Sequence, residues 1–192
     1  MRYDADGSNE ELFAQGLRDV EGFCWYPNTH QFLATNCNRR RMGDDLPPDT
    51  IEYVYAGANF GWPFCHAGSI PDPDLGWPQA CDGVPRPFQE LPAHTSPRGL
   101  RVYTGQQFPP EYLGDIFVAL YGSWERSIPV GYRIVRLDVE EGQVVATEDF
   151  ATGWLLHEQH WGRPVDLIQA PDGSLLVSDE QAGAIYRIYY EG

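Results

Sequence analysis

Residues 94–138 read HTSPRGLRVYTGQQFPPEYLGDIFVALYGSWERSIPVGYRIVRLD and contain one structural unit almost complete. Within this stretch, residues 99–104, 115–121 and 132–138 are short runs rich in Val, Ile, Leu, Tyr and Phe, separated by segments that contain Gly and Pro. Such runs between turn-forming residues are typical of consecutive antiparallel strands. No 3.6-residue period persists long enough to predict a helix. The stretch therefore predicts a β-meander.

The composition fits a globular protein that does not bind nucleic acid. Of its 192 residues, 42% are hydrophobic and 14% aromatic, which is enough to build a core. The formal charge of −15 at pH 7 would repel the phosphates of a nucleic acid. The sequence has no apolar run of the ~18 residues that a membrane span needs. The opening MRYDADGSNEEL also lacks the apolar segment of a signal peptide.

The strand pattern of the meander recurs along the chain. An arginine, a strand, a turn and a second strand that ends in a polar loop follow one another from residues 16, 96 and 162. Recurring four-stranded units predict the blades of a β-propeller. About three such units fit in the chain, whereas a closed propeller has ~4–8 blades. We therefore expect an all-β fold that is the C-terminal part of a longer, six-bladed type of propeller, with a small β-sandwich as the alternative.

The predicted boundaries divide residues 1–192 into parts of a single partial propeller domain. These parts are the end of a blade (1–15), a blade with a cysteine-bearing insertion (16–95), a full blade (96–153) and a last blade without its outer strand (154–192). Within the first part, residues 1–3 and 11–14 are expected to form two strands.

Four cysteines raise the question of disulfide bonds. Cys65 and Cys81 flank a loop rich in Pro, Gly and Asp, which has little means of ordering itself. A disulfide across a loop of this length would stabilise the fold by ~3 kcal/mol. We expect this bridge, while a Cys24–Cys37 bridge and reduced, buried cysteines stay open as alternatives.

Several arginines are predicted to gather at one end of the propeller. In an antiparallel blade, the loops before the first strand lie on the same face as the loops between the second and third strands. Arg18, Arg98 and Arg163 stand at or just before first strands, and Arg126 lies in a loop of the second kind. Guanidinium groups gathered in this way suit a planar anion with several carboxylates. The alternative is that they pair with the abundant acidic residues or with loop carbonyls.

Metal sites are less clearly indicated by the sequence. Asp44 and Asp45 offer the hard oxygen ligands that Ca²⁺ prefers, although the spacing of an EF-hand is absent and a solvated acidic loop is the alternative. His157 and His160 form an HxxH motif, but no helix or third ligand is predicted nearby, so we do not expect zinc.

Motifs along nearly the whole chain resemble those of the glucose/sorbosone dehydrogenase family. They are GDDLPPD (43–49), ANFGWPFC (58–65), AHTSPRGLRVYTG (93–105), YGSWERSIPVGYRIVR (121–136) and WGRPVDLIQAPDGSLLVSDEQAGAIYRI (161–188). The resemblance implies a six-bladed propeller and an exported quinoprotein, periplasmic or extracellular, that uses pyrroloquinoline quinone (PQQ) and Ca²⁺.

The resemblance also implies roles for particular residues. By position, Arg18, Arg126 and Arg163 resemble cofactor contacts, and residues 38–45 resemble the segment whose backbone carbonyls hold Ca²⁺. The implied reaction is hydride transfer from C1 of a sugar to the quinone, which an external electron acceptor would then reoxidise. The family's catalytic histidine lies in the N-terminal blades, so no catalytic residue is expected in this chain. Asp19 departs from the family, which usually has a neutral Asn there.

The sequence thus favours the C-terminal half of a PQQ- and calcium-dependent oxidoreductase that acts on an aldose or a sorbosone-type aldehyde. The alternative is a non-catalytic propeller that binds glycans or proteins. A Ca²⁺-dependent lactonase on a similar propeller is disfavoured, because arginines rather than carboxylates dominate the predicted channel mouth.

Overall fold

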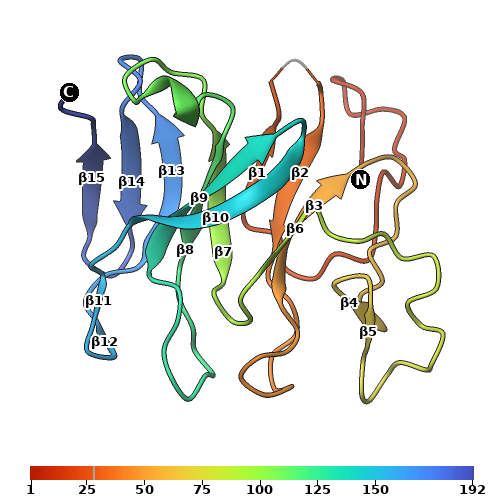
Figure 1. Ribbon diagram of the computed structural model, residues 1–192. Coiled ribbons are helices and arrows are strands. Elements are labelled where there is room, and N and C mark those ends of the chain that lie inside the picture. The colour runs from red at the N-terminus through yellow and green to blue at the C-terminus, as the bar shows by residue number, and fades with distance from the viewer. Residues whose placement is uncertain (28) are drawn as a thin grey trace.

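The computed structural model describes residues 1–27 and 29–192, and its regular structure in this part consists of strands and one short 3₁₀ turn (Figure 1). Three larger antiparallel sheets stand side by side. The first contains β1 (Phe23–Trp25), β2 (Phe32–Asn36), β3 (Asp49–Val54) and β6 (Gln89–Leu91), paired in that order.

The second sheet is the meander expected from residues 94–138, extended by one long strand. It contains β7 (Pro97–Val102), β8 (Ile116–Leu120), β9 (Arg133–Glu140) and β10 (Gln143–Ala151), each paired with the next. The 3₁₀ turn Pro110–Tyr112 lies between β7 and β8. The prediction of a β-meander is confirmed.

The third sheet contains β13 (Pro164–Gln169), β14 (Leu175–Asp179) and β15 (Ala184–Ile188). Two small hairpins, which the sequence did not predict, lie outside these sheets. They are β4 (Cys65–His66) with β5 (Ile70–Pro71), and β11 (Leu155–Leu156) with β12 (Gln159–His160).

The apolar core lies between the sheets, so strand β8 of the middle sheet is buried on both faces. Ile116, Val118 and Leu120 of β8 pack in a cluster with Leu33 and other residues of the first sheet. Phe117 and Ala119 of the same strand, which point to the opposite face, pack in a second cluster with residues of the third sheet. This double burial explains why residues 116–120 form a continuous apolar run rather than an alternating one.

Glycines allow the innermost strands to approach closely. A Cβ atom at Gly22 would lie 2.1 Å from the carbonyl oxygen of Arg98, and one at Gly99 would lie 2.7 Å from the Cα atom of Asp166. The strand β7 thus contacts both β1 and β13. Three sheets stacked face to face around neighbouring inner strands form part of a β-propeller, as expected.

Two local predictions can be compared with the structure. Residues 1–3 and 11–14 do not form strands; a single bridge joins Arg2 to Glu11, because a short strand pair is marginal without further strands to cover it. The Cys65–Cys81 disulfide is present, with an S–S distance of 2.05 Å. Cys24 and Cys37 are buried and not bonded to each other. In the described residues, no helix is long and apolar enough to cross a membrane.

Candidate functional site

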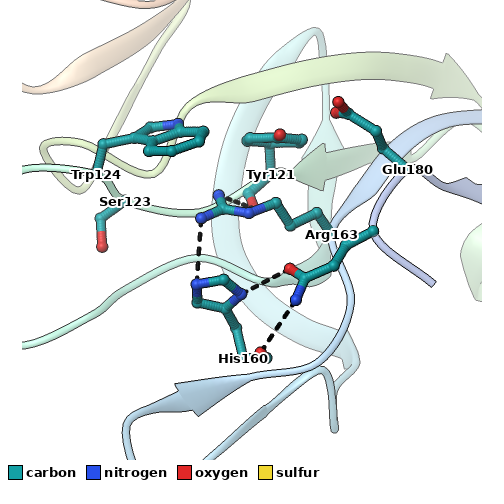
Figure 2. A pocket seen from close by; sticks show the side chains of 7 residues that line it. Tyr121, Ser123, Trp124, His160, Arg163 and Glu180 are labelled. Carbon is teal, nitrogen blue, oxygen red and sulfur yellow. Dashed lines mark hydrogen bonds between the residues drawn. The ribbon is translucent and has the colours of Figure 1, made fainter.

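Arg163 stands between the small hairpin β11–β12 and the inner strand β13 of the third sheet. Its backbone N–H donates to Oδ1 of Asp179 at 2.9 Å, which fixes the start of β13 against the end of β14. Its side chain enters a cavity of about 480 Å³. The cavity is lined by Tyr121, Ser123, Trp124, His160, Arg163, Glu180 and Gln181 (Figure 2).

The guanidinium group of Arg163 is surrounded by aromatic rings. Its central carbon lies 4.6 Å from the ring centroid of Tyr121, 4.4 Å from that of Trp124 and 4.9 Å from that of Tyr132. Its hydrogen bonds to Tyr121 O, Gly122 O and Tyr132 Oη are long, at 3.5, 3.4 and 3.3 Å. The residue is 5% exposed, and no carboxylate of the described residues lies within the 4.0 Å of an ion pair. Since arginine keeps its charge in proteins, this is a buried cation that forms no ion pair with a described carboxylate.

His160 supports the same guanidinium group from the opposite side to Trp124 (Figure 2). Its ring stacks on Tyr132 with a centroid distance of 4.8 Å and an interplanar angle of 12°. Nε2 lies 3.3 Å from Nη2 of Arg163, and Nδ1 lies 2.7 Å from Oε1 of Gln181. The guanidinium only donates and the amide oxygen only accepts, so both bonds are satisfied by neutral imidazole with its proton on Nδ1. The HxxH motif suggests only a zinc site, and nothing in the sequence indicates this role for His160.

Arg98 shares the Tyr121 ring with Arg163 but carries its own counter-charge. Its central guanidinium carbon lies 3.7 Å from the Tyr121 ring centroid, and its Nε lies 2.9 Å from Oε2 of Glu21. Burial raises the pKa of Glu21, and the positive charge of Arg98 opposes that rise. Two of the four predicted arginines therefore meet at Tyr121, and only Arg163 is left without a carboxylate.

Arg18 lies in a separate cluster beside the first sheet. Its Nη1 donates to the carbonyl oxygen of Cys37 at 3.1 Å, and its guanidinium lies 5.4 Å from the Trp62 ring centroid. Oδ2 of Asp19 lies 3.9 Å from the same Nη1, which makes a weak ion pair. The structure therefore does not bring Arg18 to the ring shared by Arg98 and Arg163.

Arg126 holds the loop that contains the predicted calcium residues. Its Nη1 donates to the carbonyl oxygen of Asp44, and its Nη2 lies 3.0 Å from Oδ1 of Asp45. The backbone N–H of Ser127 donates to the Asp44 carboxylate at 3.1 Å. These contacts lower the pKa of Asp44, chiefly through the bonds from Ser127. Both aspartates are thus engaged by protein groups, and their role as metal ligands stays a prediction.

His94 and Asp49 also form hydrogen bonds with the segment of residues 38–45. The ring Nε2 of His94 lies 2.8 Å from the Gly43 carbonyl oxygen, a contact that the sequence did not suggest. The carboxylate of Asp49 accepts the backbone N–H of Asn38 and that of Ser96, both at 2.8 Å. Among the described residues, no group of three or more Asp, Glu, His or Cys side chains is placed to hold a metal ion.

Solved structures share this fold at low sequence identity. The PQQ domain of the pyranose dehydrogenase from Coprinopsis cinerea has a TM-score of 0.75 and 20% identity, over 92% of this chain and 55% of that domain. A calcium structure of a Trichoderma reesei enzyme of carbohydrate-active family AA12 has a TM-score of 0.73 and 20% identity, over 90% of this chain and 52% of that one. Identities this low support the fold alone.

Two proteins and one protein family are similar to this chain in sequence. An uncharacterized protein of Borreliella burgdorferi is 36% identical over 190 residues, which cover 95% of this chain and 49% of that protein. The PQQ-dependent pyranose dehydrogenase of Coprinopsis cinerea is 29% identical over 126 residues, 54% of this chain and 16% of the enzyme. The chain thus spans about half the length, or less, of these relatives. The family described as Glucose / Sorbosone dehydrogenase matches residues 2–187, and the chain therefore belongs to the glucose/sorbosone dehydrogenase family.

Proposed function

We propose that this chain forms the anion-binding part of the PQQ site in a sugar dehydrogenase that oxidises an aldose or a sorbosone-type aldehyde. The observation that carries this proposal is Arg163, a buried guanidinium without a carboxylate partner in a cavity of about 480 Å³. A buried charge is costly unless it is paired. A carboxylate of the quinone would supply the missing negative charge and could accept two parallel N–H bonds from the guanidinium.

The surroundings of Arg163 also suit a planar, aromatic anion. Trp124 is 60% exposed, so its ring offers a flat face beside the guanidinium. Arg98 adds positive charge at the Tyr121 ring, although Glu21 already compensates it. Glu180 lines the same cavity and would disfavour additional negative charge on its side. The residues thus fit a ligand that presents one carboxylate to Arg163.

The chemistry of oxidation would come from the cofactor, because PQQ supplies a two-electron acceptor for hydride when it is bound. The residues of this chain would hold and orient it. Neutral His160 keeps the Arg163 guanidinium in place without adding a second positive charge. We assign no general base to this chain, in keeping with the expectation that the family's histidine lies in other blades.

Calcium would bind through main-chain oxygens of residues 38–45 rather than through Asp44 and Asp45. The carbonyl oxygens of Gly43 and Asp44 already accept bonds from His94 and Arg126. The carbonyls that remain, those of residues 38–42 and of Asp45, are therefore the ones that we propose for Ca²⁺, which prefers hard oxygen ligands.

We also propose that the protein works outside the cytoplasm, in the periplasm or the extracellular space. The Cys65–Cys81 disulfide supports this location, because disulfides persist in oxidising compartments. An external electron acceptor would then have to reoxidise the quinone.

A titration of the 192-residue chain with PQQ, followed by tryptophan fluorescence and thermal shift, tests the proposal. We expect binding by the unmodified chain and at least tenfold weaker binding by Arg163→Ala. Arg187→Ala is the matched control, because this arginine pairs with Asp172 and both side chains are about half exposed. No binding, or equal binding by Arg163→Ala, would overturn the proposal. Binding without oxidation of any aldose, even when the chain is joined to the remaining blades, would favour the non-catalytic alternative.

A further inference from the structure

A buried carboxylate lies in the insertion that the Cys65–Cys81 disulfide closes. Asp72 is 3% exposed, and its Oδ1 accepts the backbone N–H groups of Leu75 at 2.8 Å and Asp74 at 3.0 Å. Its Oδ2 lies 2.9 Å from Nε2 of His66 and also accepts a bond from Nη1 of Arg39. Four donors therefore fix this carboxylate.

The charges in this cluster are settled by their surroundings. Although burial opposes ionisation of Asp72, the bonds from Arg39 and His66 keep its pKa well below the usual range. Burial lowers the pKa of His66, so its ring is neutral at pH 7 and donates Nε2–H to Asp72. The cluster therefore contains an ionised aspartate whose main charged partner is Arg39.

Arg39 reaches this cluster from another part of the chain. It belongs to the loop after β2, and its guanidinium pairs with both Asp72 and Asp74 across the two segments. Because one guanidinium contacts two carboxylates, its orientation is defined by both. The insertion is thus joined to the loop of residues 38–45 by a two-point contact.

The remaining contacts of that loop lie at its ends. Asn38 is held by Asp49 at one end, while Gly43 and residues 44–45 are held at the other. In the middle, among the described residues, the other side-chain ion pair is an exposed one of 3.7 Å between Arg41 and Glu125. Among the ion pairs made by residues 39–42, those of Arg39 are therefore the closest.

We propose that Asp72 is a positioning residue for a calcium site, because it fixes Arg39 and thereby the main-chain oxygens of residues 39–42. This inference rests on the proposed function, which includes those oxygens among the ligands of Ca²⁺. Outer contacts that orient metal ligands commonly change metal affinity by about 10–100-fold when they are removed. The disulfide-closed insertion would then be part of the metal site although it supplies no ligand.

Asp72→Asn tests this role, with Asp172→Asn as the control. Asp172 also pairs with an arginine, but it lies in the β13–β14 turn, at the end of the sheets opposite the pocket (Figure 1). In Asp72→Asn we expect faster hydrogen exchange at the amides of residues 39–42. We also expect that the increase in PQQ affinity caused by Ca²⁺ becomes at least tenfold smaller. We expect PQQ affinity in EDTA to be unchanged, because Arg163 has no contact with this cluster.

Arg39→Lys is a second variant in case Asp72→Asn folds poorly. A lysine keeps the charge but cannot bridge two carboxylates in the same way, so a smaller change in the same direction is expected. Unchanged exchange at residues 39–42 would overturn the inference. Equal losses of PQQ affinity with and without Ca²⁺ would do so as well, since they indicate general unfolding. Failure of the unmodified chain to bind PQQ would instead remove the proposed function, and the exchange measurement would still decide the role of Asp72.

Discussion

Two arginines at the same end of the molecule differ in what compensates their charge. Arg126 donates to the Asp44 carbonyl and pairs with Asp45, so its charge is compensated within the protein. Arg163 is more deeply buried and has aromatic rings, long hydrogen bonds and a neutral histidine around it, but no carboxylate. The sequence assigned both to the cofactor. In the structure, Arg126 fixes a loop, whereas Arg163 has no carboxylate partner among the described residues.

The difference has physical weight because arginine cannot release its proton. A buried carboxyl without a charged partner can become neutral, and Glu52 is such a group: Thr50 Oγ1 donates to its Oε1 at 2.6 Å, but its Oε2 has no hydrogen-bond partner, and burial raises its pKa to about 7. Arg163 cannot become neutral in this way, because arginine stays protonated in proteins. An uncompensated guanidinium therefore favours the binding of an anion, whereas an uncompensated carboxyl favours the binding of a proton.

The largest expected effect is that of Arg163→Met on PQQ binding. We expect about a 100-fold loss of affinity, because removing one partner of a buried charge pair typically costs ~2–5 kcal/mol. We expect no loss of stability, since replacing an unpaired buried charge by an apolar side chain of similar size is often neutral or stabilising. Isothermal titration and urea unfolding of the same samples measure the two quantities.

The result separates a ligand-binding arginine from a structural one. If the unfolding free energy of Arg163→Met fell by more than ~2 kcal/mol, the aromatic contacts of Arg163 would have to be its main purpose. That outcome would remove the contrast with Arg126.

Glu52→Gln tests the opposite case to Arg163, a buried group without a charged partner that can change its charge with pH. The pKa of Glu52 is about 7 in the folded chain and near its ordinary value of 4.5 when unfolded. Between these values the folded state binds more protons, so this group makes the unmodified chain less stable as pH rises from 4.5 to 7. The stability of Glu52→Gln relative to the unmodified chain should therefore increase by about 3 kcal/mol between pH 4 and pH 8.

Urea unfolding at several pH values measures this change. Glu140→Gln, an exposed residue at the end of β9, is the control and should show no comparable trend. A constant difference between Glu52→Gln and the unmodified chain across this pH range would show that Glu52 is ionised in the fold and that its charge is compensated there.

The sequence predicted those parts of the fold whose signals are local. The strands of residues 94–138 were predictable because apolar runs and turn residues alternate within a short stretch. The hairpin β11–β12 was missed because its strands have two residues each and its turn lacks the usual Asn-Gly signal. His157 and Glu158 instead adopt positive φ angles of 48° and 67° there.

The site was less predictable than the fold, for a different reason. The regular order of strands in a blade was enough to place Arg98 and Arg163 at one end, and the structure brings both to Tyr121. Charge compensation depends on contacts between different sheets, such as that of Arg98 with Glu21. A sequence pattern does not contain such contacts, so it could not separate Arg163 from Arg126.

Arg126→Met should have a smaller effect, and on a different quantity. The loop of residues 43–45 would lose the bonds to Asp44 and Asp45, which corresponds to about 1 kcal/mol of unfolding free energy. PQQ affinity in EDTA should change less than threefold, because Arg126 does not line the cavity of Arg163. A loss of affinity as large as that of Arg163→Met would return Arg126 to the cofactor site, as the sequence first suggested.

The smallest effect is expected for Asp172→Asn, which removes an exposed ion pair far from the cavity. Bonds from Ser174 and the pairing with Arg187 hold the pKa of Asp172 at about 2, below its ordinary value. A lowered carboxyl pKa contributes stability above the unfolded value of 3.8, and that contribution is lost as pH falls toward 2. Exposed pairs are strongly screened by water and salt, so unfolding at pH 7 should differ little from that of the unmodified chain. A marked fall in PQQ affinity would mean that the binding site responds to any lost arginine pair, and the distinction between compensated and uncompensated guanidinium groups would then carry no information about the ligand.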